Sequence, residues 1–272
     1  MPEVVKYINQ PLDINFREGQ KGKTTKDDDV IIIEYISANN IVVQFQDEYK
    51  AVIKSSYGDF LKGYMRNPYE IVIGKHGFIG EGIYKRSYNV NGNNITYKDF
   101  RTWYEMHRRA ENYSGFKPEY SDVKVCEEWY NFQNFAKWYH ENYYEVKGDV
   151  MNLDKDILQP QSRIYSPDTC CFLPRRLNEI FHNLNKIRSN GLPVGIEWAR
   201  RKTSEDGYRV KVTYVDDNNR RKYVRKTFDC LEDAKEFYSK FKQEDTRRII
   251  ISYKDIIPEH VYNALYNYNF KY

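Results

Sequence analysis

The segment from residue 103 to residue 178 constrains the fold more than any other part of the chain, because short apolar, aromatic and acidic patterns follow one another in it. It runs through W-Y-E-M (Trp103–Met106), an aromatic-rich stretch (Val123–Trp138), L-D-K-D-I-L (Leu153–Leu158) and Y-S-P-D-T-C-C-F-L-P-R-R-L-N (Tyr165–Asn178). Large apolar residues recur there at spacings of three and four, which predicts helices. The segment therefore predicts a helix, a second helix, a short acidic strand end, a turn and a third helix.

The expected helices can be placed by their apolar positions. The first covers Phe100–Ala110, and the second covers Trp129–Tyr139. The third begins in the region of Pro174, which suits a first helical turn, and ends near Asn190-Gly191. The segment Asn89–Asn94 has the composition of a turn or hinge.

The first 85 residues have a different pattern and predict a small β module. Val30–Tyr35 and Ile41–Phe45 are rich in β-branched residues, and the turn-forming segment Ser37–Asn40 lies between them. Glu48–Ile53 can supply a third strand.

The C-terminal third predicts a sheet that packs on a helix. Tyr208–Val215 alternates basic and apolar residues with a period of two, Asp216–Asn219 has turn chemistry, and Arg220–Phe228 supplies the return strand. A helix is expected after Leu231, and a short helical cap after Pro258. The expected class is multidomain α+β, with a β module (residues 1–85), a central core with aromatic-rich helices (86–190), a three-stranded sheet on a helix (191–248) and a cap (249–272).

Charge is concentrated in one short region of the chain. The formal net charge is +4. Trp198–Thr227 alone holds ten basic and four acidic residues, a local charge of +6. Such a concentration is typical of a surface that faces phosphate groups.

Other broad features indicate an intracellular protein that does not enter a membrane. No apolar run is long enough to span a bilayer, and the first residues do not have the pattern of a secretory signal. A cytoplasmic location is therefore expected. The four cysteines, none of which forms a C-x-x-C pair, are expected to be reduced and mostly buried.

The central pattern resembles the degenerate HNH-type (ββα-metal) core of phage homing-endonuclease-like proteins. The resemblance is carried by L-D-K-D at Leu153–Asp156 and by the Ser-Pro turn and helix that follow it. It implies that Asp154 and Thr169 occupy metal-ligand positions for Mg²⁺ or Mn²⁺. It also implies that Asp154, Lys155 and Asp156 form the catalytic segment.

Two of these positions depart from the family pattern. Lys155 stands where the general-base histidine is expected, and a charged amine cannot accept a proton. Thr169 stands where many relatives carry asparagine, and a hydroxyl is a weaker ligand for a hard metal ion. The alternative is that Asp154 and Asp156 bond backbone amides and the arginines Arg175 and Arg176, and so only hold the core together.

The C-terminal sheet resembles the integrase-type, ethylene-response-factor-like DNA-binding domain. Matching features are Gly195, the basic cluster after Ala199, both strands of the hairpin and the following helix. In that family a three-stranded sheet enters the major groove of DNA. Lys226 stands where the family usually has glycine, a departure that affects the local strand geometry. The resemblance implies these DNA-facing residues: Trp198, Arg200, Arg201, Arg209, Lys211 and Arg225.

Three functions remain open at this point. The first is a phage-type HNH-like endonuclease that binds double-stranded DNA through the basic sheet and cuts it with a divalent metal. Contacts from six or so cations to phosphates would give a log–log slope of affinity against salt of roughly −5. The second is a sequence-specific DNA-binding protein that does not cut, and the third is a phage structural or host-interaction protein.

Overall fold

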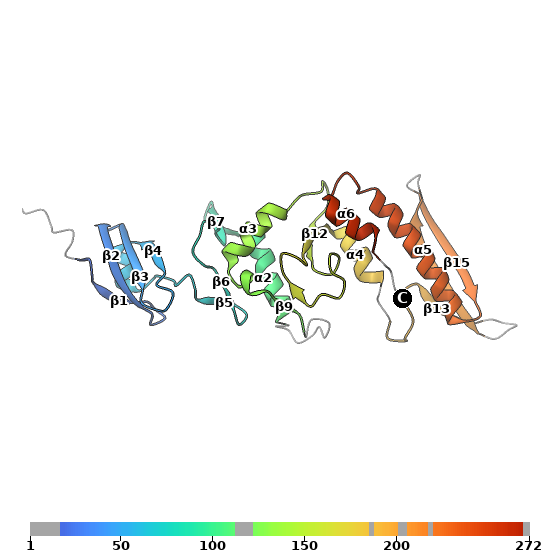
Figure 1. Cartoon of the computed structure of the whole chain (residues 1–272), viewed down its shortest axis with the longest axis horizontal. Helices are drawn as coiled ribbons and strands as arrows, with labels where there is room; N and C mark the ends of the chain where they lie inside the picture. The colour runs from blue at the N-terminus through green and yellow to red at the C-terminus, as the bar shows by residue number, and fades with distance from the viewer. Residues whose placement is uncertain (1–16, 112–121, 185–187, 201–205, 217–219, 269–272) are drawn as a thin grey trace, which may run out of the picture. The chain divides into compact units, whose positions relative to one another are not determined.

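The computed structural model describes residues 17–111, 122–184, 188–200, 206–216 and 220–268. It divides into two compact units, Met1–Lys137 and Trp138–Tyr272, and the boundary falls within helix α3 (Phe132–Asn142). Each unit contains helices and small antiparallel sheets, so the expected α+β class is confirmed (Figure 1). Within the described ranges, no helix is long and apolar enough to cross a membrane.

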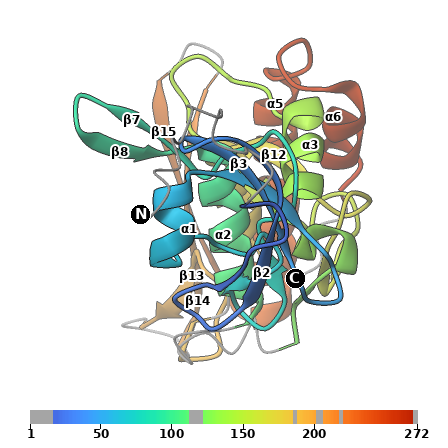
Figure 2. The same ribbon diagram turned by 90° about the vertical axis from the view of Figure 1, so that its left-hand side faces the viewer.

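The first unit begins with a four-stranded antiparallel sheet in the order β1-β2-β3-β4. Alternate side chains of its central strands, Val30 and Ile32 with Ile41 and Val43, are buried together with Phe60 of the short helix that follows. The expected strands are therefore confirmed (Figure 2). The elements are β1 (Lys21–Lys23), β2 (Asp29–Ser37), β3 (Asn40–Phe45), β4 (Val52–Ser55) and α1 (Tyr57–Lys62).

The fourth strand starts later than expected because a side chain builds a turn before it. Asp47 Oδ1 accepts hydrogen bonds from the backbone amides of Tyr49 and Lys50 at 3.1 and 3.0 Å. Lys50 also has a positive φ of 51°. These residues therefore belong to a turn, and the strand covers only the last part of the expected Glu48–Ile53 segment and the residues after it.

The remainder of the first unit is built around buried tryptophans. Trp103 and Trp129 are both fully buried, and Trp103 Nε1 donates to the Trp129 carbonyl at 2.7 Å. The Asn89–Asn94 turn is confirmed as the tip of a hairpin, in which Asn91 and Gly92 both have positive φ. The elements are β5 (Ile71–Ile73), β6 (Gly77–Phe78), β7 (Ser87–Val90), β8 (Asn93–Thr96), α2 (Lys98–Ala110), β9 (Lys124–Val125) and the 3₁₀ helix η3 (Glu127–Tyr130).

The expected helix over Trp129–Tyr139 is wrong in one respect, because the chain breaks it at Asn131. This residue has extended backbone angles between η3 and α3, and its Oδ1 accepts the amide hydrogen of Gln133 at 2.9 Å. An asparagine that bonds the backbone two residues ahead competes with a continuous helix. The apolar spacing of the segment predicts its buried side chains, and it carries no sign of the Asn131 side-chain bond.

The second unit contains a hairpin followed directly by a helix. Strand β10 (Met151–Asp154) pairs antiparallel with β12 (Cys171–Pro174), and α4 (Arg175–Leu184) begins at the next residue. Strand β11 (Ile164–Tyr165) lies in the connection between them. Pro174 ends β12 and so precedes the helix, whose first turn it was expected to occupy.

A second sheet in the same unit confirms the expected C-terminal hairpin. Its order is β13-β14-β15, and helix α5 packs on one face through Ala234 and Tyr238 (Figure 1). The elements are β13 (Ile196–Ala199), β14 (Gly207–Val215), β15 (Arg221–Phe228), α5 (Leu231–Ile251) and α6 (Glu259–Tyr266). The short helix expected after Pro258 is confirmed as α6.

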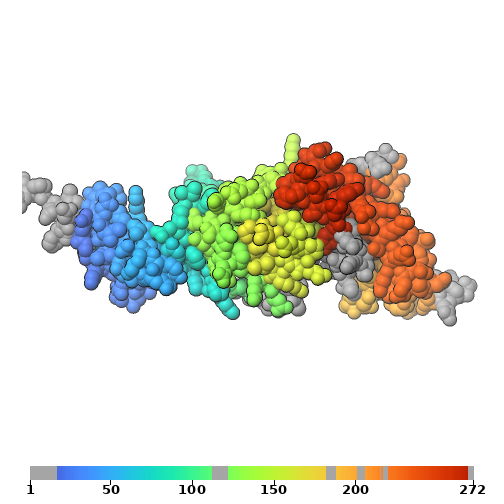
Figure 3. Space-filling model, in the orientation of Figure 1, coloured from blue at the N-terminus to red at the C-terminus, as the bar shows by residue number. Residues whose placement is uncertain are grey.

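Helix α5 extends past the boundary expected at residues 248 and 249. Its residue Ile250 is buried with Leu177 and Phe181 of α4 and with Leu265 of α6. The C-terminal segment, expected as a separate cap, thus shares one hydrophobic core with the β10–β12 hairpin and α4. In Figure 3 the red C-terminal residues lie against the yellow residues of the hairpin region.

Candidate nucleic-acid interface

One face of the sheet β13–β14–β15 is free of the helix and carries basic side chains. Val210 and Val212 of β14 are buried in the cluster that includes α5, so Arg209 and Lys211 point to the opposite face. The register of the sheet brings further residues to this face, because Lys211 is paired with Arg225, Thr213 with Tyr223 and Val215 with Arg221. We call this the basic face and define it by Glu197, Arg209, Lys211, Arg221, Tyr223 and Arg225.

Neighbouring cations of β15 point to the other side. Lys226 Nζ lies 4.7 Å from the ring centre of Phe237 in α5, and Lys222 Nζ lies 3.8 Å from a carboxylate oxygen of Asp216. Successive residues of a strand point to opposite faces. The cations of the basic strand β15 are therefore divided between the two faces of the sheet.

A single carboxylate lies among the cations of the basic face. Glu197 of β13 is opposite Arg209, and its Oε1 lies 2.6 Å from Lys211 Nζ and 3.3 Å from an Arg209 guanidinium nitrogen. The hydrogen bond from Lys211, more than any other interaction, lowers the pKa of the Glu197 carboxyl. Four cations against one carboxylate leave a net charge of +3 on this face.

One residue of the expected DNA-facing set lies on the helix side of the sheet by register. Trp198 is paired with Tyr208, their ring centres are 4.6 Å apart, and Tyr208 packs against the α5 cluster. Trp198 is therefore on the helix side of the sheet, although its side chain is 56% exposed. Arg200, exposed after the end of β13, belongs to neither face by register. Arg201 lies outside the described residues.

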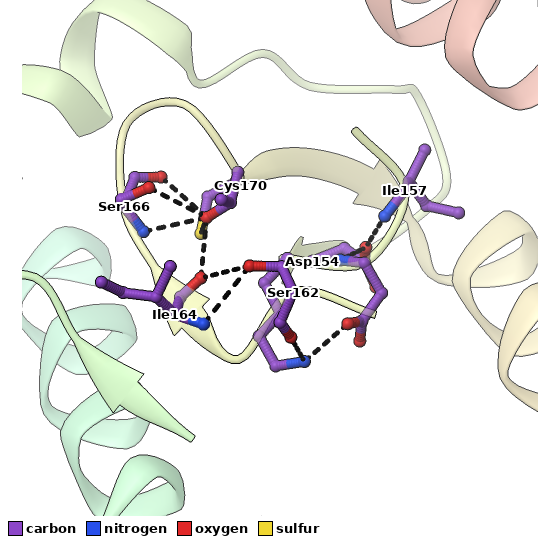
Figure 4. Close-up of polar contacts among 9 residues, drawn as sticks. Asp154, Ile157, Ser162, Ile164, Ser166 and Cys170 are labelled. Carbon is purple, nitrogen blue, oxygen red and sulfur yellow. Dashed lines mark hydrogen bonds and ion pairs between the residues drawn. The ribbon is translucent and has the colours of Figure 1, made fainter. Parts of the chain in front are cut away.

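The acidic segment Asp154–Asp156, at the end of strand β10, forms a turn (Figure 4). Asp154 Oδ1 accepts the amide hydrogens of Asp156 at 2.8 Å and Ile157 at 3.0 Å. Burial raises the pKa of the Asp154 carboxyl. Lys155 is buried, and its ammonium group donates to Asp156 Oδ1 at 2.6 Å and to the Ser162 carbonyl at 3.0 Å.

Thr169 occupies a separate turn in the same connection. Its hydroxyl donates to the Ile164 carbonyl at 2.8 Å and accepts the amide hydrogen of Ser166 at 3.1 Å. The residue is also buried. The hydroxyl closes the Ser-Pro turn before β12, which is a structural role.

These contacts do not fit a divalent metal centre. The Lys155 ammonium group neutralises the Asp156 carboxylate, and Asp154 and Thr169 each bond their own turn. Across the part of the chain that the structure describes, no group of three or more His, Cys, Asp or Glu side chains could hold a metal ion. The catalytic set Asp154, Lys155 and Asp156 and the metal pair Asp154 and Thr169 therefore stay predictions, and in this structure Asp154 and Thr169 form hydrogen bonds within turns. The backbone bonds expected under the alternative interpretation are present for Asp154.

The cysteines are not engaged in disulfides. All four are free, with Cys170 and Cys171 buried, Cys126 partly buried and Cys230 exposed. Cys230 Sγ accepts the amide hydrogen of Asp233 and so caps α5.

Comparison of the chain with protein-family models, curated proteins and solved structures found no match. Its candidate interface therefore rests on the geometry of the sheet. Sequence reasoning missed three residues of the basic face: Glu197, Arg221 and Tyr223. A signal was present for Arg221 and Tyr223, because they are four and two residues from Arg225, respectively, on the same strand. Nothing in the sequence alone indicated that Glu197 lies beside Arg209 and Lys211.

Proposed function

We propose that the protein binds double-stranded DNA through the basic face of the sheet β13–β14–β15. The observation that carries the proposal is the gathering of Arg209, Lys211, Arg221 and Arg225 on the one face that α5 leaves uncovered. Side chains on this face can approach a phosphate backbone without displacing any part of the hydrophobic core. The resemblance to ethylene-response-factor-like domains supports the same face.

The dimensions of the sheet suit the major groove. Strand β13 is paired only with residues 207–210 of β14, so residues 211–215 and 221–225 form a two-stranded ribbon beyond it. Strands in a ribbon are about 4.8 Å apart and rise about 3.3 Å per residue. The major groove, roughly 12 Å wide, admits a ribbon of this kind. Lys211, Arg221, Tyr223 and Arg225 project from one side of it.

The composition of the face favours a polyanion over a protein partner. Tyr223 is 57% exposed between the two arginines of its strand, where its ring and hydroxyl can contact sugar or phosphate. A net charge of +3 predicts a log–log slope of affinity against salt of roughly −3. This value is smaller than the slope expected from all cations of the segment, because Lys222 and Lys226 point to the helix side.

The sharpest test compares adjacent cations on the same strand. Arg225→Ala removes a cation from the basic face, and Lys226→Ala removes one from the helix side. Affinity for a mixed-sequence duplex should be measured by fluorescence anisotropy over a salt series. Arg225→Ala should weaken binding and reduce the magnitude of the slope by about 0.9, while Lys226→Ala should leave the slope unchanged.

Two results would contradict the proposal. One is a wild-type affinity for duplex DNA that does not change with salt. The other is an equal loss of DNA affinity in Arg225→Ala and Lys226→Ala. That result would mean that binding depends on the total charge of the segment and not on the face that carries it. Thermal unfolding of both variants serves as the control for folding.

A further inference from the structure

A cavity of about 550 Å³ lies in the second unit between α4, α5 and the distal part of β14. Its volume falls in the range of small-molecule sites, roughly 300–1,000 Å³. Apolar and aromatic side chains line part of it, and charged side chains from both helices line the rest. The lining includes Arg176, Thr213, Tyr214, Tyr238, Lys242 and Asp245.

The most informative of these residues is Asp245 of α5. It is only 7% exposed, and among the described residues its carboxylate makes neither a hydrogen bond nor an ion pair, although the cations Lys242, Arg248 and Arg176 act on it from a greater distance. Burial raises the pKa of this carboxyl. A buried carboxylate without a partner costs stability. Buried charged groups without a partner are commonly found at sites where a ligand supplies the missing hydrogen-bond donor.

Lys242 lies one helical turn before Asp245 and has the complementary property. It is partly buried, burial lowers the pKa of its amine, and no described residue forms a hydrogen bond or ion pair with it. Arg176 of α4 adds a second cation to the lining of the cavity. The cavity thus holds a hydrogen-bond acceptor in Asp245 and an anion-binding pair in Lys242 and Arg176.

The strand edge contributes backbone groups of both kinds. The Lys211 amide donates to the Gly195 carbonyl, so the backbone groups of Lys211 point away from β15. Backbone groups alternate in direction along an antiparallel strand. Those of Thr213 therefore point the same way, at a position where β13 is no longer paired with β14. Thr213 lines the cavity and presents one N–H and one C=O there.

We propose that this cavity binds a nucleoside monophosphate. An exocyclic amino group or a ring N–H of the base bonds the Asp245 carboxylate, and the Thr213 edge pairs with a further donor or acceptor of the base. Tyr214 and Tyr238 supply aromatic contacts to the flat ring. Lys242 and Arg176 bind the phosphate. A purely apolar ligand would leave the Asp245 carboxylate unpaired, and a simple anion would be repelled by it.

The test uses isothermal titration calorimetry on the full chain with AMP, GMP, CMP, UMP and their nucleosides. At least one monophosphate should bind with a stoichiometry of one. Asp245→Asn should weaken that binding by about tenfold or more, because it removes a charge-assisted acceptor. Lys242→Met should weaken binding of the monophosphate and leave the affinity of its nucleoside unchanged, because Arg176 remains as the second phosphate contact. Glu244→Gln and Lys240→Met, at exposed positions of the same helix, should leave the affinity unchanged.

The proposal is independent of DNA binding, and the experiment keeps the two apart. Mononucleotides that bound the basic face would lose affinity in Arg225→Ala and keep it in Asp245→Asn, and that pattern overturns the cavity assignment. Absence of binding for all four monophosphates at millimolar concentration overturns it as well. Thermal unfolding of Asp245→Asn should show an intact fold, since the change removes an unpaired buried charge.

Discussion

Replacing Glu197 by glutamine should strengthen DNA binding while it weakens the fold. Glu197 is the one carboxylate of the basic face, and it contacts both Lys211 and Arg209. Its removal raises the net charge of the face from +3 to +4. The log–log slope of affinity against salt should accordingly change from roughly −2.7 to roughly −3.6.

The gain in affinity follows from simple electrostatics. A unit charge about 7 Å from a phosphate, at an effective dielectric constant between about 40 and 80, contributes about 0.6–1.2 kcal/mol. Removing this repulsion corresponds to a decrease in Kd of about three- to sevenfold at low salt. The effect should fade as salt screens it, because the Debye length falls to about 8 Å at physiological ionic strength.

Stability should change in the opposite direction. The Glu197 and Lys211 side chains are 33% and 40% exposed, so the lost ion pairs should cost less than about 1 kcal/mol in the free energy of unfolding. Anisotropy titrations over a salt series and urea unfolding measure the two quantities, with Glu236→Gln on exposed α5 surface as the control. A fall in both affinity and stability would refute the reasoning, since it would mean that Glu197 positions the cations productively.

Three further predictions concern other parts of the chain. Asp245→Asn should raise the free energy of unfolding at neutral pH by about 1 kcal/mol. Because burial raises the folded-state pKa of the Asp245 carboxyl, the wild type gains stability as pH falls from that pKa to the unfolded value. The difference in stability between variant and wild type should therefore shrink in acid, and urea unfolding over a pH series measures it. Gly63→Ala should lower stability by about 1–3 kcal/mol, as thermal unfolding measures, because φ of Gly63 is 70° and a Cβ there would lie 2.8 Å from a backbone oxygen. Gly58→Ala, within the helix that Gly63 ends, is the control and should be neutral or stabilising. Asp154→Ala should lower the free energy of unfolding by about 1–2 kcal/mol, because it leaves two backbone amides without a hydrogen bond. Plasmid nicking in Mg²⁺ or Mn²⁺ should be equally absent in wild type and variant. Nicking by the wild type alone would support the endonuclease hypothesis.

Local sequence patterns predict a helix or strand correctly where the spacing of apolar residues alone decides the conformation. The period-two alternation of Tyr208–Val215 predicted β14, and the apolar spacing of Phe100–Ala110 predicted α2. The same rule misjudged the second aromatic helix, because a single hydrogen bond from Asn131 interrupts it. Apolar spacing reports which side chains are buried, and a polar side chain can still end the helix that buries them.

The residues around the acidic segment show why a residue type alone does not define a metal site. The β10–β12–α4 order is present, while Asp154 and Thr169 each bond their own turn. A carboxylate that holds a metal and one that caps a turn are the same residue type. Only the position of the neighbouring donors distinguishes them, and here Lys155 and backbone amides surround the acidic segment.

The sequence by itself determined several of the main elements of this protein and the segment in which its positive charge is concentrated, because both depend on residues close together in the chain. Only the tertiary structure decided which of those charges act together. Arg221, Lys222, Arg225 and Lys226 are all cations of one strand, and pairing with β14 and packing of α5 turn the first and third to the open face. The cavity at Asp245 has the same origin, because a carboxylate becomes a site only when distant elements bury it and leave it without a partner.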